Sequence, residues 1–152
     1  MSTEDVRSYL KERNRKLEVI EFEESTATVE LAAAALGVEP ARIAKTMAFG
    51  LKGRNILILS KGDARVDNRK FKDNFGEKAR MLKPEEVLEA TGHPVGGVCP
   101  FALKGEMDVY LDVSLQAFET VFPAAGSRNS AVEMTPGQLF DITGAGWVDV
   151  CT

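Results

Sequence analysis

The stretch IAKTMAFGLKGRNILIL, residues 43–59, decides the fold class. Two runs rich in aliphatic residues, Ile43 to Leu51 and Asn55 to Leu59, flank Lys52-Gly53-Arg54, and this pattern predicts a β-hairpin. Alternate residues of a strand share a face. The first run therefore places a lysine, Lys45, on one face with four apolar side chains, those of Ile43, Met47, Phe49 and Leu51.

Short helices are expected on both sides of this hairpin, because capping residues bracket them. Thr28 precedes an alanine-rich segment that stops at Gly37, and Pro84 opens a segment that closes at Gly92. Thr135-Pro136-Gly137-Gln138 combines a capping box with a proline at the first helical position. The sequence predicts helices near residues 3–15, 29–36, 67–75, 84–91, 115–118 and 135–142, and further strands near residues 17–23, 107–111, 120–122, 131–134 and 147–150.

The chain is expected to form one domain over residues 1–152. A length of 152 residues with 44% hydrophobic residues suits one ordinary globular domain that buries its own core. Short strands interleave with short helices, which predicts an α+β fold with a mixed, largely antiparallel sheet. Gly96-Gly97 lacks the G-x-G-x-x-G spacing of a dinucleotide-binding fold.

Composition excludes several function classes. Cys99 and Cys151 are too few and too isolated for a disulfide framework or a zinc site, so we expect no metal, no cofactor and a reducing, cytoplasmic location. No apolar run approaches the ~20 residues that span a bilayer, so no membrane partner is expected. The net charge of -4 argues against a general nucleic-acid coat protein. Lys61 to Lys83 nevertheless holds eight basic residues against four acidic ones, a segment suited to phosphate contact or to solvation.

Two glycine-containing loops are candidate ligand-binding segments. His93 to Pro100 contains two prolines and two adjacent glycines, and Pro123 to Asn129 contains Gly126-Ser127. Such loops present backbone N–H groups that can bind a carboxylate, a phosphate or an oxyanion, and they can equally be tight connections.

Lys45 is the most informative single residue. A charge on the apolar face of a strand costs free energy unless it is paired, reaches solvent or faces a polar cleft. Cys99 with His93 is an alternative nucleophile and base, which predicts inactivation by thiol alkylation. From the residues alone, the chain has a cleft with a lysine and two glycine loops, suited to an anionic or carbonyl-bearing ligand.

Several segments together resemble the YbaK/EbsC family, the free-standing relatives of the editing domain of bacterial prolyl-tRNA synthetases. The similar segments are TVELAAAALGV (residues 28–38) with IAKT (43–46), TGHPVGGVCPFA (91–102), Asp112 and AGSRNSAVEMTPGQL (125–139). The resemblance implies a partly closed sheet. It also implies an aminoacyl-tRNA deacylase acting in trans on mischarged tRNA, with a prolyl-tRNA synthetase as a possible partner.

By this resemblance Lys45 is the residue required for deacylation. The substrate-binding residues it implies come from the neighbouring strands and from the G-x-x-x-P and A-G-S loops: Phe22, Thr46, Gly96, Gly97, Pro100, Gly126 and Ser127. Cysteine-specific members carry polar pocket residues where this chain has Phe22, Ala131 and the segment Pro123-Ala124-Ala125. A small amino acid such as alanine or cysteine on tRNA-Pro is the expected substrate. The alternative is a binding module for aminoacyl-tRNA or nucleotide ends that associates with a synthetase without hydrolysis.

Overall fold

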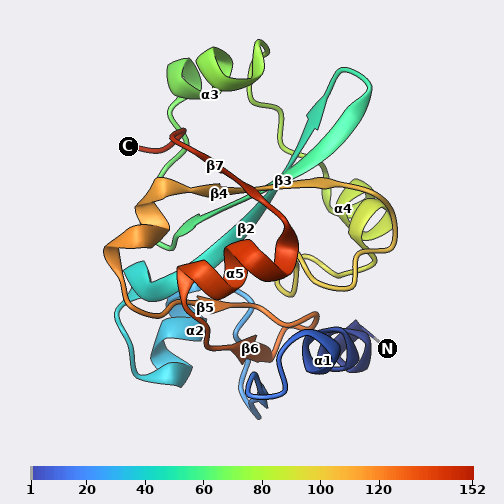
Figure 1. Cartoon of the computed structure of the whole chain (residues 1–152), viewed down its shortest axis with the longest axis vertical. Helices are drawn as coiled ribbons and strands as arrows, with labels where there is room; N and C mark the ends of the chain where they lie inside the picture. The colour runs from blue at the N-terminus through green and yellow to red at the C-terminus, as the bar shows by residue number, and fades with distance from the viewer. Residues whose placement is uncertain (1) are drawn as a thin grey trace.

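A long antiparallel hairpin runs through the middle of the molecule (Figure 1). The computed structural model describes residues 2–152, so Met1, the first residue of the expected domain, lies outside the described residues. The hairpin consists of β2 (Ile43–Leu51) and β3 (Arg54–Lys61), paired from Ala44↔Lys61 to Leu51↔Arg54. Gly53 makes the turn with a φ of 78°, a left-handed conformation that glycine adopts without strain. The hairpin predicted from the sequence is confirmed.

The hairpin is the centre of a five-stranded sheet with the order β5-β2-β3-β4-β7. The outer strands are β4 (Asp108–Asp112), β5 (Phe122–Pro123) and β7 (Gly146–Val148). The sheet is mixed, as expected, but β2–β5, β3–β4 and β4–β7 are all parallel. Antiparallel pairing is thus less extensive than the sequence suggested, because the connections between these strands carry helices and long loops that allow parallel return.

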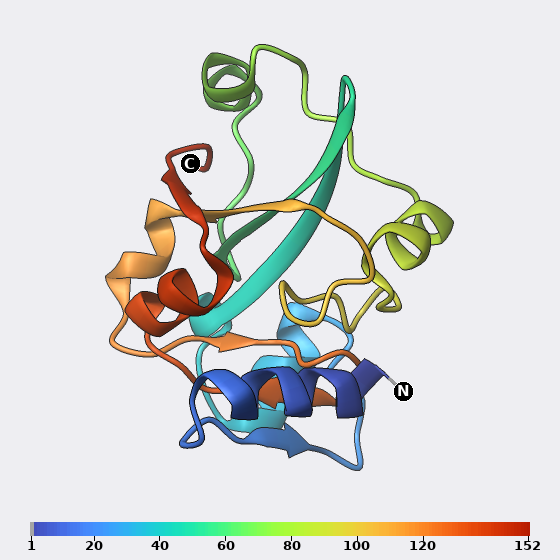
Figure 2. The same cartoon turned by 45° about the vertical axis from the view of Figure 1, so that its right-hand side comes forward.

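A second, two-stranded sheet lies at the end of the molecule that carries the N-terminal helix. It pairs β1 (Val19–Glu21) antiparallel with β6 (Ser130–Val132). Helix α1 (Ser2–Arg13) runs alongside this small sheet (Figure 2). The bridge Ala124↔Ala131 links β6 to the chain just after β5, so the two sheets meet near the A-G-S loop.

The remaining helices are short, and their caps agree with the sequence. They are α2 (Val29–Leu36), α3 (Asn68–Phe75), α4 (Pro84–Thr91) and α5 (Pro136–Thr143), with 3-10 turns at Pro40–Arg42 and Val113–Ala117. The hydroxyl of Thr28 accepts a hydrogen bond from the N–H of Leu31, which caps α2, and Gly37 ends that helix in the left-handed conformation. Thr135 and Gln138 form the expected capping box of α5.

Apolar clusters cover both faces of the hairpin. One face carries Ala44, Ala48, Leu57 and Leu59, which belong to the largest cluster. The other face carries Phe49, Leu51, Ile56 and Ile58, which pack with Phe71 of α3. Both faces of β2 and β3 are therefore fixed by packing, and the hairpin forms a rigid support for side chains at its edge. No helix in residues 2–152 is long and apolar enough to cross a membrane.

Candidate functional site

A cavity of about 330 Å³ opens beside the outer edge of β2. Its wall is formed by the segment before α2, by β2, by the start of α4 and by the chain around β5 and β6. Most of the side chains in it are small and apolar, among them Ala32, Ala44, Ala48, Ala124 and Ala131. A cavity of this size and composition accommodates a small apolar group beside a polar one.

The floor of the cavity is a stretch of β2 that lies between two neighbouring segments. β5 pairs with β2 only at Ile43 and Ala44, while further along the strand Ala48 accepts a hydrogen bond from the N–H of Leu82 at 3.0 Å. Every second residue of a strand directs its N–H and C=O to the same edge. The backbone groups of Thr46 therefore face this interval, where the cavity lies.

Lys45 lines the cavity. Among residues 2–152 it is the one residue with a charged side chain in the wall. It lies on the same face of β2 as Met47 and Phe49, as the alternation predicted. Its ammonium donates a hydrogen bond to the carbonyl oxygen of Ala64, in the segment after β3. An ammonium has three N–H donors, so two more are available to a ligand.

Of the loop residues that the resemblance implies as substrate-binding, Gly96 lies in the cavity wall, whereas Gly97, Gly126 and Ser127 are not part of it. The N–H of Gly126 donates to the carbonyl oxygen of Gly97 at 3.0 Å. A Cβ atom on Gly97 would lie 2.6 Å from the backbone nitrogen of Ser127, so only glycine allows this approach. These glycines join the two loops and thereby hold Gly96 in place.

Several N–H groups of these loops donate hydrogen bonds within the protein. Gly97 donates to the carbonyl of Pro94 at 2.9 Å, and Ser127 donates to the hydroxyl of Ser130 at 3.2 Å. The N–H groups of Gly97, Gly126 and Ser127 were expected to face a ligand, but all three donate hydrogen bonds to groups of the protein itself. The edge of β2 and Lys45 are better placed than these groups to stabilise a developing negative charge.

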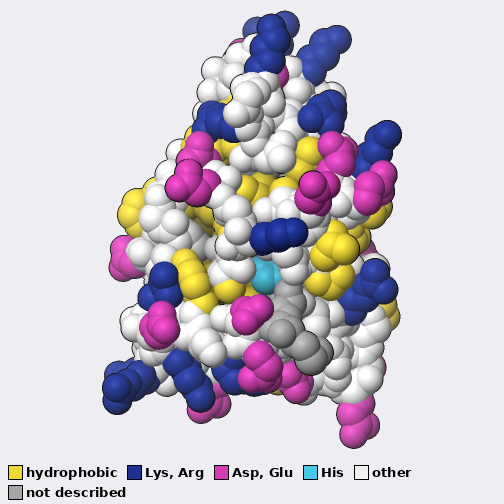
Figure 3. Space-filling model, turned by 90° about the vertical axis from the view of Figure 1, so that its right-hand side faces the viewer, with side chains coloured by type: hydrophobic (Ala, Val, Ile, Leu, Met, Phe, Trp, Pro, Cys, Tyr) yellow, Lys and Arg dark blue, Asp and Glu magenta, His cyan; other side chains and the backbone are white. Residues whose placement is uncertain are grey.

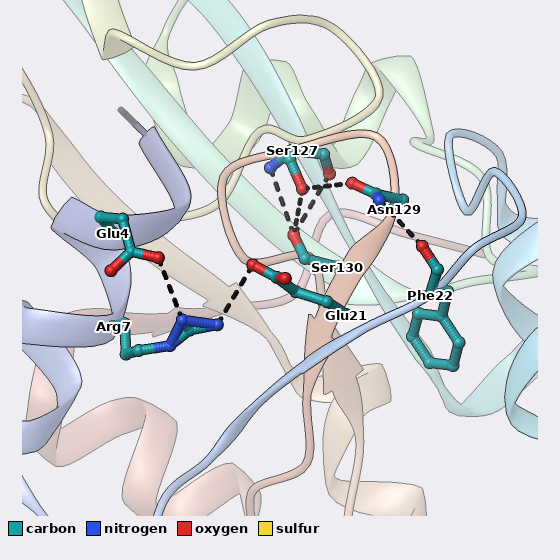
Figure 4. A network of polar contacts seen from close by, with 7 residues as sticks. All are labelled: Glu4, Arg7, Glu21, Phe22, Ser127, Asn129 and Ser130. Carbon is teal, nitrogen blue, oxygen red and sulfur yellow. Dashed lines mark hydrogen bonds and ion pairs between the residues drawn. The ribbon is translucent and has the colours of Figure 1, made fainter.

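The A-G-S loop is held by a network that also reaches Phe22 (Figure 4). The hydroxyl of Ser127 lies 2.9 Å from Oδ1 of Asn129 and 2.8 Å from the hydroxyl of Ser130. Nδ2 of Asn129 donates to the carbonyl of Phe22 at 2.8 Å. In Figure 4 the ring of Phe22 points away from Ser127. Ser127 is therefore part of the loop network and Phe22 lies at its end, and neither residue is in the cavity wall.

Pro100 is also outside this wall. It is buried and borders a second, more polar hollow together with Tyr9, Arg54 and Glu106. The structure thus brings together in the cavity three of the eight residues that the sequence singled out: Lys45, Thr46 and Gly96.

Thr26 and the α4 side of the cavity were not predicted from the sequence. Leu82, Pro84 and Val87 line the wall on the α4 side, and Thr26 lines it from the segment before α2. Thr26 is 6% exposed, and its hydroxyl has no hydrogen-bond partner among the described residues. The local sequence marks Thr28 as the cap of α2, but it gives no signal that Thr26 lines a cavity.

The alternative nucleophile is in the core. Cys99 is fully buried, and this burial raises the pKa of its thiol to about 12. Burial also lowers the pKa of His93, although Nε2 of His93 lies 3.6 Å from the sulfur. Neither residue lines the cavity. A buried thiol with a raised pKa, outside the cavity, is poorly suited to act as a nucleophile, so the structure does not favour the cysteine-hydrolase alternative.

Comparison with known proteins identifies the family. Residues 23–142 match the model of the aminoacyl-tRNA editing domain. The chain belongs to this family. No cluster of three or more His, Cys, Asp or Glu side chains in residues 2–152 could hold a metal ion.

Relatives of this editing domain are found both as free proteins and within synthetases. The chain is 54% identical to the uncharacterized protein YwhH of Bacillus subtilis, over 99% of this chain and 98% of YwhH. It is 26% identical to an Enterococcus faecalis protein with the provisional name Cys-tRNA(Pro)/Cys-tRNA(Cys) deacylase EbsC, over 86% of this chain and 81% of EbsC. It is 34% identical to part of the proline–tRNA ligase of Bacillus licheniformis, over 70% of this chain and 18% of the ligase.

The fold is that of solved editing domains. A crystal structure described provisionally as a trans-editing enzyme for prolyl-tRNA synthetase superposes with a TM-score of 0.92 at 34% identity. The match covers 99% of this chain and 97% of that one. The α+β fold expected from the sequence is therefore confirmed.

Proposed function

We propose that the protein is an aminoacyl-tRNA deacylase that acts in trans and hydrolyses the ester of a mischarged tRNA. The observation that carries the proposal is Lys45, a charged side chain in a cavity whose other side chains are apolar or carry hydroxyls. An aminoacyl ester is already activated, so its hydrolysis mainly needs positioning and stabilisation of a tetrahedral oxyanion. Lys45 and the edge of β2 supply both without a histidine or cysteine.

The wall of the cavity supports a small amino acid as the group removed from the tRNA. Ala124 and Ala131 line the cavity, and no carboxylate side chain in residues 2–152 lines it. One methyl group in an apolar pocket changes selectivity by only about 1–3 kcal/mol. Alanine or cysteine on tRNA-Pro are the proposed substrates. The similarity to a proline–tRNA ligase supports tRNA-Pro and a prolyl-tRNA synthetase partner.

The direct test is a panel of tRNAs charged with proline, alanine, cysteine, serine or threonine. We expect hydrolysis of Ala-tRNA-Pro or Cys-tRNA-Pro at least tenfold faster than the spontaneous reaction, with Pro-tRNA-Pro spared. Retention of charged tRNA without turnover would instead indicate the binding module. A folded protein that neither binds nor hydrolyses any member of the panel would contradict the proposed function.

The basic segment between Lys61 and Lys83 offers a surface for the tRNA itself. Basic side chains gather at the end of the molecule that carries α3 and the tip of the hairpin (Figures 1 and 3). Arg69 and Lys72 of α3 and Lys78 beyond it are exposed. Arg80 and Lys83 are also exposed and flank Met81 and Leu82, which line the cavity. The basic side chains therefore continue from α3 to the cavity.

Lys70 does not belong to this surface. Its ammonium lies 3.0 Å from both Oδ1 of Asp149 and the carbonyl oxygen of Cys151, and the hydrogen bond to Asp149 raises its pKa. Lys70 thus fixes the C-terminal segment against α3, and a substitution there would change the fold as well as the charge.

Charge reversal on α3 is expected to weaken tRNA binding. The test is the slope of log K against log salt concentration, where K is the binding constant for tRNA. In the double variant Arg69→Glu, Lys72→Glu this slope should decrease in magnitude by about 2, because each lost phosphate contact lowers it by about 1. The matched control is Lys11→Glu, Lys16→Glu, which makes the same charge change at exposed positions in and after α1. The slopes are measured by filter binding from 50 to 200 mM salt. Equal slopes for the two variants would show that α3 does not contact the tRNA.

A further inference from the structure

Two threonine hydroxyls in the cavity are buried without a partner. Thr26 and Thr46 both line the wall, and neither hydroxyl oxygen has a hydrogen-bond partner among the described residues. A buried polar group without a partner is costly, and in native proteins most such groups are satisfied. Two of them in one cavity indicate that a bound molecule supplies the missing hydrogen bonds.

The other polar side chains of the wall are already engaged. The hydroxyl of Thr28 accepts from the N–H of Leu31 at 3.1 Å, and the hydroxyl of Ser130 takes part in the A-G-S loop network. Lys45 is a donor only. Since no carboxylate in residues 2–152 lines the wall, Thr26 and Thr46 are the side chains that remain to accept a hydrogen bond from a ligand.

We propose that the hydroxyls of Thr26 and Thr46 bind the free α-amino group of the aminoacyl ester. This inference rests on the proposed function and names the chemical class that the site selects. The α-amino group is the hydrogen-bond donor that the amino acid itself contributes to every aminoacyl ester, and it needs acceptors. The carbonyl of Thr46, which faces the same interval of the β2 edge, is a third acceptor within the cavity.

The geometry of threonine permits this role. A rotation about χ1 exchanges the positions of its methyl and hydroxyl groups, and threonine populates more than one such rotamer. Each hydroxyl can thus remain covered in the empty cavity and turn toward an amino group when one is bound. A hydroxyl also donates, so it can bind the amino group in either protonation state.

The consequence is selection against esters without a free amine. Hydroxyacyl esters lack the group, and N-acetylated or peptidyl esters block it. A site whose buried polar groups are left unpaired rejects such analogues more strongly than an apolar pocket rejects a methyl group. For the wild-type protein we expect kcat/KM for an aminoacyl-tRNA to exceed that for its hydroxyacyl analogue by about tenfold or more.

The test compares alanyl-tRNA with lactyl-tRNA and N-acetyl-alanyl-tRNA. Thr26→Val and Thr46→Val keep the shape of the side chain and should reduce the preference for the free amine to about threefold or less. Thr26→Ser keeps the hydroxyl and should keep the preference. Thr28→Val is the matched control: it removes a hydroxyl that caps α2, so the melting temperature should fall while the preference stays.

Each outcome is decisive. Thr26→Val and Thr46→Val should melt no lower than the wild type, because they remove an unsatisfied buried hydroxyl. Hydrolysis with an unchanged ratio in both valine variants, or a wild type that does not distinguish the esters, would overturn this inference and leave the deacylase intact. A folded wild type that hydrolyses none of the esters overturns the proposed function, and the inference with it.

Discussion

Lys45→Ala should lower kcat/KM for the mischarged tRNA by about 10²–10³-fold, the loss typical of one removed oxyanion donor. The physical reason is that Lys45 provides the positive charge in the cavity wall, where surrounding apolar side chains strengthen its field. Its ammonium is held by the carbonyl of Ala64, so it is already oriented before substrate arrives. The measurement is the initial rate of deacylation at substrate concentrations below KM.

The control for this result is Lys52→Ala, in the exposed turn of the same hairpin. It removes an identical charge away from the cavity and should change kcat/KM by less than twofold. A Lys45→Ala protein that is folded and within threefold of the wild type would show that Lys45 does not act in catalysis. If its affinity for tRNA falls while turnover of bound substrate is preserved, Lys45 instead holds the tRNA end.

Gly97→Ala is expected to lower the stability of the protein strongly. The added Cβ would lie 2.6 Å from the nitrogen and 2.7 Å from the Cα of Ser127, and these are backbone atoms that cannot turn aside. The two loops must separate, which weakens the hydrogen bond from Gly126 to Gly97. We expect a loss of about 1–3 kcal/mol, typical of overpacking, and a fall in melting temperature of roughly 2–4 °C for each kcal/mol.

Activity should fall together with stability, because Gly96 stands in the cavity wall next to the displaced residue. Gly105→Ala is the control, since the nearest atom to its Cβ would be the carbonyl oxygen of Ala90 at an ordinary 3.8 Å. That variant should stay within about 0.5 kcal/mol of the wild type. Equal melting temperatures for the two variants would contradict the close packing of the two loops.

The helix boundaries were predictable because they depend on local chemistry. Thr28, Asp67 and Gly37 act within one helical turn of their own position, and each has the capping role that its residue type predicts. Lys45 was found because the alternation of a strand is visible in the sequence. The family resemblance added the likeness to editing domains, which the family match confirms.

The features that could not be predicted from the sequence depend on contacts between distant segments. The parallel pairing of β3 with β4 follows from how residues 62–107 pack, which no local pattern records. Likewise, the N–H of Gly126 is occupied by Gly97, 29 positions away in the sequence, so the loop looked more available than it is. The capping role of Thr28 was predictable, but only the folded chain shows that the hydroxyl of Thr26 is buried in the cavity wall without a partner among the described residues.

The short gap along the outer edge of β2 also protects the protein from unwanted association. Exposed strand edges can recruit a strand from another molecule and so promote aggregation. Here β5 covers the edge up to Ala44, and the segment around Leu82 covers it again from Ala48. The interval between these two segments is too short for an extended peptide to pair along it. Its backbone groups can therefore bind a small ester, but they cannot pair with a β-strand of another molecule.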